Sequence, residues 1–260
     1  MAHEVAHHHG EHEVSFWPLP VGIAILLTPI AITAQFAWKN PMLALILGGV
    51  ALVLAIIGLA GWANEFFTVG HDEGYGNLGI YFFIISEIII FGTVFAAFWT
   101  ARALHADVWV SQWIPEAMNL KMPIILTLIL WASSFTIFKA EQAMHHGESG
   151  KSVVFLLATM FFGLLFAVLH IMEWRHLWHE GFTLSSNMYG TGFYTLTGIH
   201  TSHVIVGLVM QAYVLVFTLA GKITPDKMTI FRTTSAYWHF VDVMWLLVAS
   251  TAYVVGGLKI

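Results

Sequence analysis

The sequence of 260 residues contains no cysteine. Disulfides, thiolate-bound zinc or iron–sulfur clusters, haem attached through thioethers and a dinuclear copper centre held by thiolates are therefore all excluded within this chain. Any redox centre would have to be built from other ligands or belong to another chain.

Charged residues are also scarce. Asp, Glu, Lys and Arg make up 10% of the sequence, whereas a soluble domain carries roughly a quarter. The formal net charge is −5 and there is no basic patch, so nucleic acid is not an expected partner. The scarcity of charge instead indicates that lipid surrounds most of the chain.

Long apolar runs account for the 58% of residues that are hydrophobic. A helix needs about 20 such residues to cross a ~30 Å hydrocarbon core, and seven segments meet that requirement: 16–38, 41–62, 75–104, 123–142, 151–178, 187–219 and 232–258. Tryptophans lie near the predicted ends, as an interfacial aromatic belt requires: Trp17, Trp38, Trp62, Trp109, Trp113, Trp174 and Trp178. The sequence predicts an all-α integral membrane protein with seven transmembrane helices.

Polar segments divide the chain into four regions. Residues 1–15 form a His-rich and Glu-rich tail without Lys or Arg, and we expect it to be retained because it lacks the features of a signal peptide. Only Lys39 and Asn40 separate the first two spans, which predicts a helical hairpin over 16–62. A polar linker over 63–74 precedes a five-helix bundle over 75–260. The ten basic residues divide equally between the two sides, so charge alone does not orient the chain.

Glu87 is the ionisable residue placed deepest in a predicted span. It follows Ile84, Ile85 and Ser86 and precedes three further isoleucines. An ionisable group at this depth is costly unless it is paired or hydrated. We favour a carboxyl that is hydrogen-bonded to a neighbouring helix over one that titrates or gates a pathway.

Histidines recur in the span over 187–219. His200, His203 and Gly207 lie on one stripe of a helix. The two imidazoles could reach one metal, but no carboxylate ligand adjoins them. We favour a buried polar network with Glu87 or Glu173, in which Gly207 allows another backbone to approach.

Two further polar residues share a face near the start of the last span. His239 and Asp242 lie three positions apart, so each could satisfy the other. Structural anchoring is the favoured role of both residues.

Several of these segments resemble a known family. Ser86–Glu87 within an apolar helix, His200-Thr-Ser-His203-Val-Ile-Val-Gly207, Tyr189-Gly-Thr-Gly-Phe193 and Tyr237-Trp-His-Phe-Val-Asp-Val-Met-Trp245 look like the signature segments of subunit III of the haem-copper cytochrome c oxidases. The resemblance extends over nearly all of the chain after residue 15, and the last segment is the most specific.

The resemblance implies a fold and a set of sites. The first two helices would form one bundle and the other five a second, with a V-shaped, lipid-filled cleft between them. Glu87 would correspond to the buried carboxyl that reacts with carbodiimides in the family, while Trp62, Glu65 and His71 match positions that contact phospholipid headgroups. Gly61 stands where many relatives have a second tryptophan.

The resemblance also implies a role in a larger enzyme. The complete oxidase passes electrons from cytochrome c to dioxygen in aerobic respiration and pumps protons across the membrane. Its haems and coppers belong to subunits I and II, so this chain would carry no cofactor except bound phospholipids. It would pack on subunit I, support proton uptake and enzyme stability, and cross a bacterial cytoplasmic or mitochondrial inner membrane with its N-terminus on the cytoplasmic or matrix side.

Three alternatives remain open. A quinol oxidase could use a similar subunit, although such relatives often lack the first two helices. A membrane di-iron oxygenase would need about eight histidines on one membrane face, whereas the pairs His145–His146 and His176/His179 flank opposite ends of one span. A transporter could use Glu87 as its proton site, but repeats of broken helices are not evident.

Overall fold

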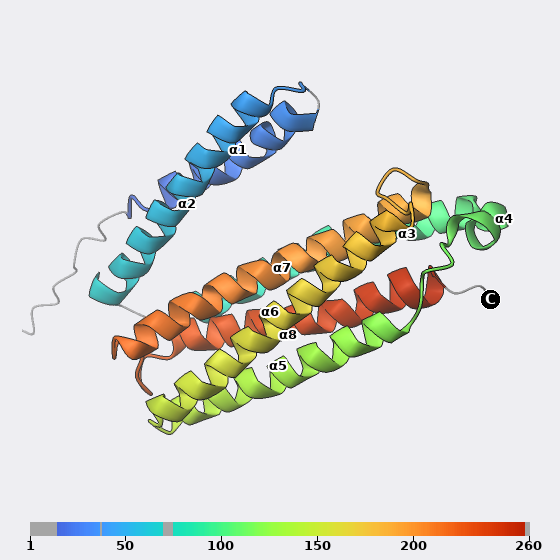
Figure 1. Ribbon diagram of the computed structural model, residues 1–260. Coiled ribbons are helices and arrows are strands. Elements are labelled where there is room, and N and C mark those ends of the chain that lie inside the picture. The colour runs from blue at the N-terminus through green and yellow to red at the C-terminus, as the bar shows by residue number, and fades with distance from the viewer. Residues whose placement is uncertain (1–14, 37, 70–74, 258–260) are drawn as a thin grey trace, which may run out of the picture. The chain divides into compact units, whose positions relative to one another are not determined.

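The computed structural model describes residues 15–36, 38–69 and 75–257, and these residues are almost entirely helical (Figure 1). Seven long helices cover the predicted spans, which confirms the all-α membrane fold: α1 Pro18–Phe36, α2 Pro41–Val69, α3 Tyr75–Leu104, α5 Lys121–His145, α6 Ser149–His179, α7 Met188–Leu219 and α8 Thr229–Ala249. Three short elements complete the described chain: α4 Ala106–Val108 and the π-helical turns η1 Trp109–Trp113 and η2 Ser250–Val255.

Contacts divide the chain into two compact units, Met1–His71 and Asp72–Ile260. In the first unit, α1 and α2 pack against each other along their length. Asn40 accepts a hydrogen bond from the Leu43 backbone at 3.1 Å and so begins α2 immediately after the hairpin turn. Gly61 lies so close to the Trp17 ring that a Cβ there would be 2.2 Å from it. The small residue at 61 therefore allows Trp17 to pack against α2.

Three helices of the second unit end in the same way. Gly147, Gly181 and Gly221 follow α5, α6 and α7 with φ of 75°, 80° and 68°. In each case the glycine N–H and the next N–H donate back to carbonyls of the last turn. This is the Schellman arrangement, which favours glycine because it requires a left-handed backbone. Short turns therefore follow α5, α6 and α7.

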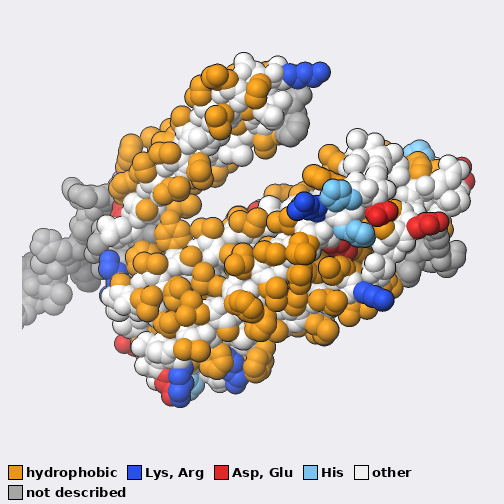
Figure 2. Space-filling view, in the orientation of Figure 1, with side chains coloured by type: hydrophobic (Ala, Val, Ile, Leu, Met, Phe, Trp, Pro, Cys, Tyr) orange, Lys and Arg blue, Asp and Glu red, His pale blue; other side chains and the backbone are white. Residues whose placement is uncertain are grey.

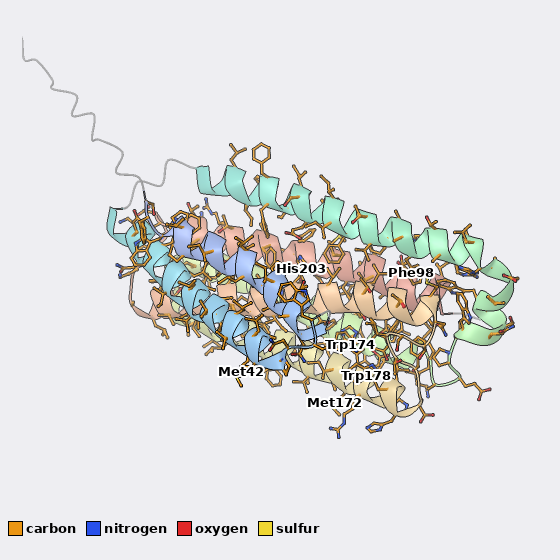
Figure 3. All side chains as sticks on the ribbon, turned by 90° about the horizontal axis from the view of Figure 1, so that it is seen from above. Met42, Phe98, Met172, Trp174, Trp178 and His203 are labelled. Atoms are coloured by element: carbon orange, nitrogen blue, oxygen red, sulfur yellow. The ribbon has the colours of Figure 1, made fainter. Side chains whose placement is uncertain are left out.

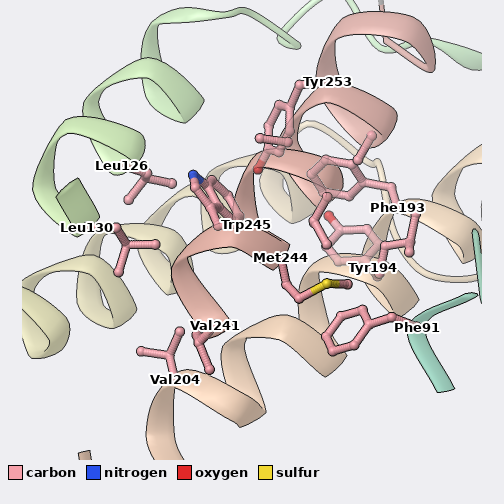
Figure 4. Packing of buried hydrophobic residues seen from close by; sticks show 14 of the residues in the cluster. Phe91, Leu126, Leu130, Phe193, Tyr194, Val204, Val241, Met244, Trp245 and Tyr253 are labelled. Carbon is pink, nitrogen blue, oxygen red and sulfur yellow. The ribbon is translucent and has the colours of Figure 1, made fainter. Parts of the chain in front are cut away.

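An aromatic core joins α3 and α5–α8 (Figure 4). The indole N–H groups of three buried tryptophans are satisfied across helices: Trp109 by the Gly256 carbonyl at 2.9 Å, Trp238 by Ser133 Oγ at 3.0 Å and Trp245 by Thr127 Oγ1 at 2.9 Å. Each ring thus contributes apolar area and one directional bond to the bundle.

The outer surface of this unit is apolar, as lipid contact requires. Exposed Leu, Ile, Phe and Val side chains cover the middle of the helices, and charged side chains gather towards their ends (Figure 2). A bundle with aromatic interior packing and an apolar exterior is suited to a hydrocarbon solvent rather than to water.

The structure differs from the sequence prediction at three places. Helix α2 continues through Asn64 and Glu65 to Val69, so helix replaces the first part of the polar linker expected over 63–74. The elements α4 and η1 were not predicted. Trp109 in η1 was expected in the interfacial belt, but its side chain is fully buried, because its ring packs on Phe98 and Tyr189.

Candidate functional site

Glu87 of α3 and His203 of α7 form an ion-pair contact within the bundle. The carboxyl Oε2 lies 2.9 Å from the imidazole Nε2, and Glu87 is 9% exposed. His203 lies about midway along the helices (Figure 3). The glutamate and the histidine singled out in two separate spans are therefore in direct contact.

The hydrogen bonds of His203 determine which atoms of the Glu87–His203 pair carry protons. Nδ1 lies 2.8 Å from the Ile199 carbonyl, which can only accept, so Nδ1 carries a hydrogen. The contact between Nε2 and Glu87 Oε2 then requires one more proton, held either by the imidazole or by the carboxyl. In both states the pair has no net charge, which is the inexpensive state for a buried site in lipid.

Aromatic rings surround this pair. The Phe91 ring centroid lies 5.0 Å from that of His203, and Tyr237 stacks on the imidazole at 6.5 Å. The Tyr237 hydroxyl also donates to the His203 carbonyl at 3.2 Å. The imidazole is thereby held between α3, α7 and α8.

A second buried polar group lies on α6. Glu173, which is 8% exposed, accepts a hydrogen bond from the Tyr253 hydroxyl at 2.6 Å. The neighbouring His170 Nδ1 lies 3.0 Å from Thr201 Oγ1, whose own hydrogen is directed to the Thr197 carbonyl at 2.8 Å. Thr201 therefore accepts from His170, so the imidazole is protonated on Nδ1. Glu173 is therefore hydrogen-bonded to η2 through Tyr253, and His170 is hydrogen-bonded to α7 through Thr201.

His200 does not take part in the buried polar network expected for it. Its side chain is fully buried, and neither ring nitrogen has a hydrogen-bond partner among the described residues. The ring packs against Phe166 and Trp245, at centroid distances of 5.6 and 5.0 Å. Across residues 15–36, 38–69 and 75–257, no three His, Asp or Glu side chains are placed to hold a metal ion.

His239 and Asp242 of α8 meet through a third residue. Ser134 of α5 donates to Asp242 Oδ2 at 2.7 Å and lies 3.3 Å from His239 Nδ1. Because Ser134 donates its hydroxyl hydrogen to Asp242, the Ser134 oxygen accepts a hydrogen bond from His239 Nδ1. The two α8 side chains thus bind α5 through Ser134 rather than bonding directly to each other.

Two of the residues expected to contact lipid, Trp62 and Glu65, lie in the last two turns of α2. Trp62 is 45% exposed, and Glu65 accepts a hydrogen bond from Ser15 Oγ at 2.5 Å. Trp17, which directly precedes α1, packs over Gly61 of α2. His71 lies outside the described residues.

Sequence reasoning expected a polar network that joins His203 to Glu87 or Glu173, but it missed the partners of the other groups. Ser134, Thr201 and Tyr253 are common residue types in apolar helices, and only the fold brings them to Asp242, His170 and Glu173. One signal was available for His170, because it lies three residues before Glu173 on the same helical face. The partners on other helices had no comparable signal.

Comparisons with known proteins give a consistent result. A family model described as cytochrome c oxidase subunit III matches residues 7–257. The chain is 30% identical over 262 residues to cytochrome c oxidase subunit 3 of Podospora anserina, covering 96% of both chains. It is 35% identical over 179 residues to a probable cytochrome c oxidase subunit 3 of Nocardia farcinica, covering 69% of this chain and 87% of the relative. A probable quinol oxidase subunit 3 of Staphylococcus saprophyticus is 28% identical over 194 residues, 75% of this chain and 96% of the relative.

Proposed function

The chain belongs to the cytochrome c oxidase subunit III family, and we propose that it is the non-redox subunit III of a proton-pumping cytochrome c oxidase. In this role it packs on subunit I of the complex, whose subunits I and II hold the haems and coppers, and it supports proton uptake and the stability of the enzyme. Cytochrome c supplies electrons to the complex and not to this chain.

The observation that carries this proposal is the use of the buried polar side chains. Glu87 binds His203, Glu173 binds Tyr253 and Asp242 binds Ser134, each across two helices. Polar groups that are hydrogen-bonded between helices hold a bundle together, and each of these carboxyls has one oxygen bonded to a side chain of another helical element. This is the pattern expected of a subunit that shapes and stabilises a complex rather than one that ligates a redox ion.

The proposed lipid-binding role rests on the hairpin. The exposed indole of Trp62 and the carboxyl of Glu65 lie towards the end of α2, where an amphipathic ring suits the headgroup region. Trp17 supplies a second indole near Gly61. We infer that this end of the hairpin holds phospholipid, with His71 as a further contact.

The test is purification of the tagged chain in a mild detergent. The expected result is recovery of two larger subunits with haem and copper in the complex, and oxygen consumption driven by reduced cytochrome c. The isolated chain should contain no stoichiometric haem, copper or iron by absorbance and metal analysis. A haem spectrum from the pure chain, or recovery without large partner subunits, would overturn the proposal.

A quinol oxidase subunit III is the second candidate, supported by the relative from Staphylococcus saprophyticus. The presence of the α1–α2 hairpin favours cytochrome c. Oxygen consumption by the same preparation with a reduced quinol in place of cytochrome c decides between the two.

A further inference from the structure

A polar hollow of about 310 Å³ opens between α3, α5 and α8. Its lining includes Ile80 and Tyr81 of α3, Glu141 of α5, and Arg232, Ser235 and His239 of α8. All three helices belong to the unit over 72–260.

The hollow lies at one end of the bundle. Arg232 is in the first turn of α8, which begins at Thr229, and Glu141 is one turn from the end of α5 at His145. These positions correspond to the level at which a transmembrane helix leaves the hydrocarbon and enters the headgroup region.

The two opposite charges in the hollow do not neutralise each other by direct pairing. Among the residues that the structure describes, the ion pairs are Lys151–Glu148 and Glu87–His203. Arg232 and Glu141 therefore face the same space without an ion pair to a described residue. A guanidinium binds a phosphate through two parallel hydrogen bonds, and a carboxylate accepts hydrogen bonds from a primary ammonium.

The faces that flank the hollow are apolar towards the middle of the membrane. Ile88 lies two turns beyond Tyr81 on α3, Val243 lies one turn beyond His239 on α8, and Phe138 lies one turn before Glu141 on α5; all three are exposed. The acyl chains of a lipid bound in the hollow would pack against these side chains, whereas a soluble phosphate ester has no apolar part to contact them.

We propose that this hollow binds the phosphoethanolamine headgroup of a membrane phospholipid, with the phosphate on Arg232 and the ammonium on Glu141. Phosphatidylethanolamine satisfies both charges. Phosphatidylglycerol has no cation for Glu141, and the quaternary ammonium of phosphatidylcholine has no N–H to donate. This inference requires only that the chain resides in a membrane, so it stands or falls independently of the oxidase role.

The experiment uses the purified complex in lipid nanodiscs that contain phosphatidylethanolamine, phosphatidylcholine or phosphatidylglycerol with a diazirine in one acyl chain. Photo-adducts are mapped by mass spectrometry to the peptides that contain Ile88 and Val243. We expect phosphatidylethanolamine to give the highest yield. Arg232→Gln should lower that yield about fivefold, as expected for one basic contact near a membrane surface, and Glu141→Gln should remove the preference over phosphatidylglycerol.

Two matched variants serve as controls. Lys139 is a cation on α5 that binds Gln142 outside the hollow, and Glu148 pairs with Lys151 at 2.9 Å. Lys139→Gln and Glu148→Gln should leave the adduct pattern unchanged. Equal yields from all three lipids in the unaltered complex would overturn the proposal without recourse to variants. Loss of the adduct on addition of soluble phosphoethanolamine at millimolar concentration would overturn the assignment to a lipid.

Discussion

The contact between Glu87 and His203 is the residue-scale feature with the clearest chemical consequence. Because His203 Nδ1 donates to the Ile199 carbonyl, one proton is shared between Nε2 and the Glu87 carboxyl. A side-chain amide at position 87 can donate to the neutral Nε2 and so replace the protonated carboxyl. We therefore expect the contact between positions 87 and 203 to survive replacement of the Glu87 carboxyl by an amide.

We predict that Glu87→Gln leaves the oxidase assembled and lowers its activity only modestly. The amide keeps the link between α3 and α7, a link that is worth about 0.6–1.7 kcal/mol in membrane helices. The measurements are the yield of complete complex and its rate of oxygen consumption. Complete failure to reduce oxygen would contradict a supporting role for this residue.

Tyr253 gives a second residue-scale prediction. Its hydroxyl donates to Glu173 Oε2 at 2.6 Å in a fully buried setting. Tyr253→Phe leaves that carboxyl without this donor and should lower the free energy of unfolding by about 1–3 kcal/mol. Thermal unfolding of the complex in detergent provides the measurement. Tyr213→Phe is the control, because the Tyr213 ring stacks on Phe217 in a less buried position; an equal loss in both variants would rule out a specific role for the bond.

At the scale of elements, Trp238 brings four helices together. It belongs to α8, donates to Ser133 of α5, and lies against Gly163 of α6 and Gly207 of α7. A Cβ at Gly207 would be 2.6 Å from the ring, and one at Gly163 would be 2.7 Å from it. These two glycines leave the space that the indole occupies.

Gly207→Ala should therefore destabilise the five-helix unit, by about 1–3 kcal/mol for overpacking a filled core. Gly92→Ala on α3 is the matched control, because nothing lies within 4 Å of a Cβ built there. That control should leave stability unchanged or slightly raised, since alanine favours helix more than glycine does. Resistance to denaturation by SDS measures both variants, and equal behaviour of the two would contradict the close packing.

The long helices could be predicted from the sequence, but the short turns and most of the contacts between helices could not. Hydrophobic length located all seven long helices, because a membrane span must satisfy its own backbone and so reads as one continuous apolar run. It did not locate η1 or η2, since a π-helical turn has no distinct hydrophobic period. Glu87, His203 and Asp242 stood out because ionisable groups are rare in apolar spans. Ser134, the partner of Asp242, did not stand out, because a residue's neighbours on other helices depend on helix rotation, which packing decides.

At the scale of the whole molecule, the two units have different sources of stability. The unit over 72–260 contains the aromatic core and the tryptophan hydrogen bonds, all of which lie between the start of α3 and Gly256. The hairpin has small residues at its own interface, among them Ala24, Ala34 and Ala51. Among the described residues of the hairpin, none belongs to the main core cluster.

A chain without residues 1–71 should therefore still fold in detergent. Its expected helix content by circular dichroism is that of α3–α8, and its elution should be monodisperse. Removal of residues 229–260 instead deletes Trp238, Trp245 and Tyr253 from the core, so that variant should aggregate or lose cooperative unfolding. If the first variant aggregates under conditions in which the full chain is monodisperse, the five-helix unit depends on the hairpin for its stability. In that case the hairpin stabilises the five-helix unit even though it contributes nothing to the main core cluster among the described residues.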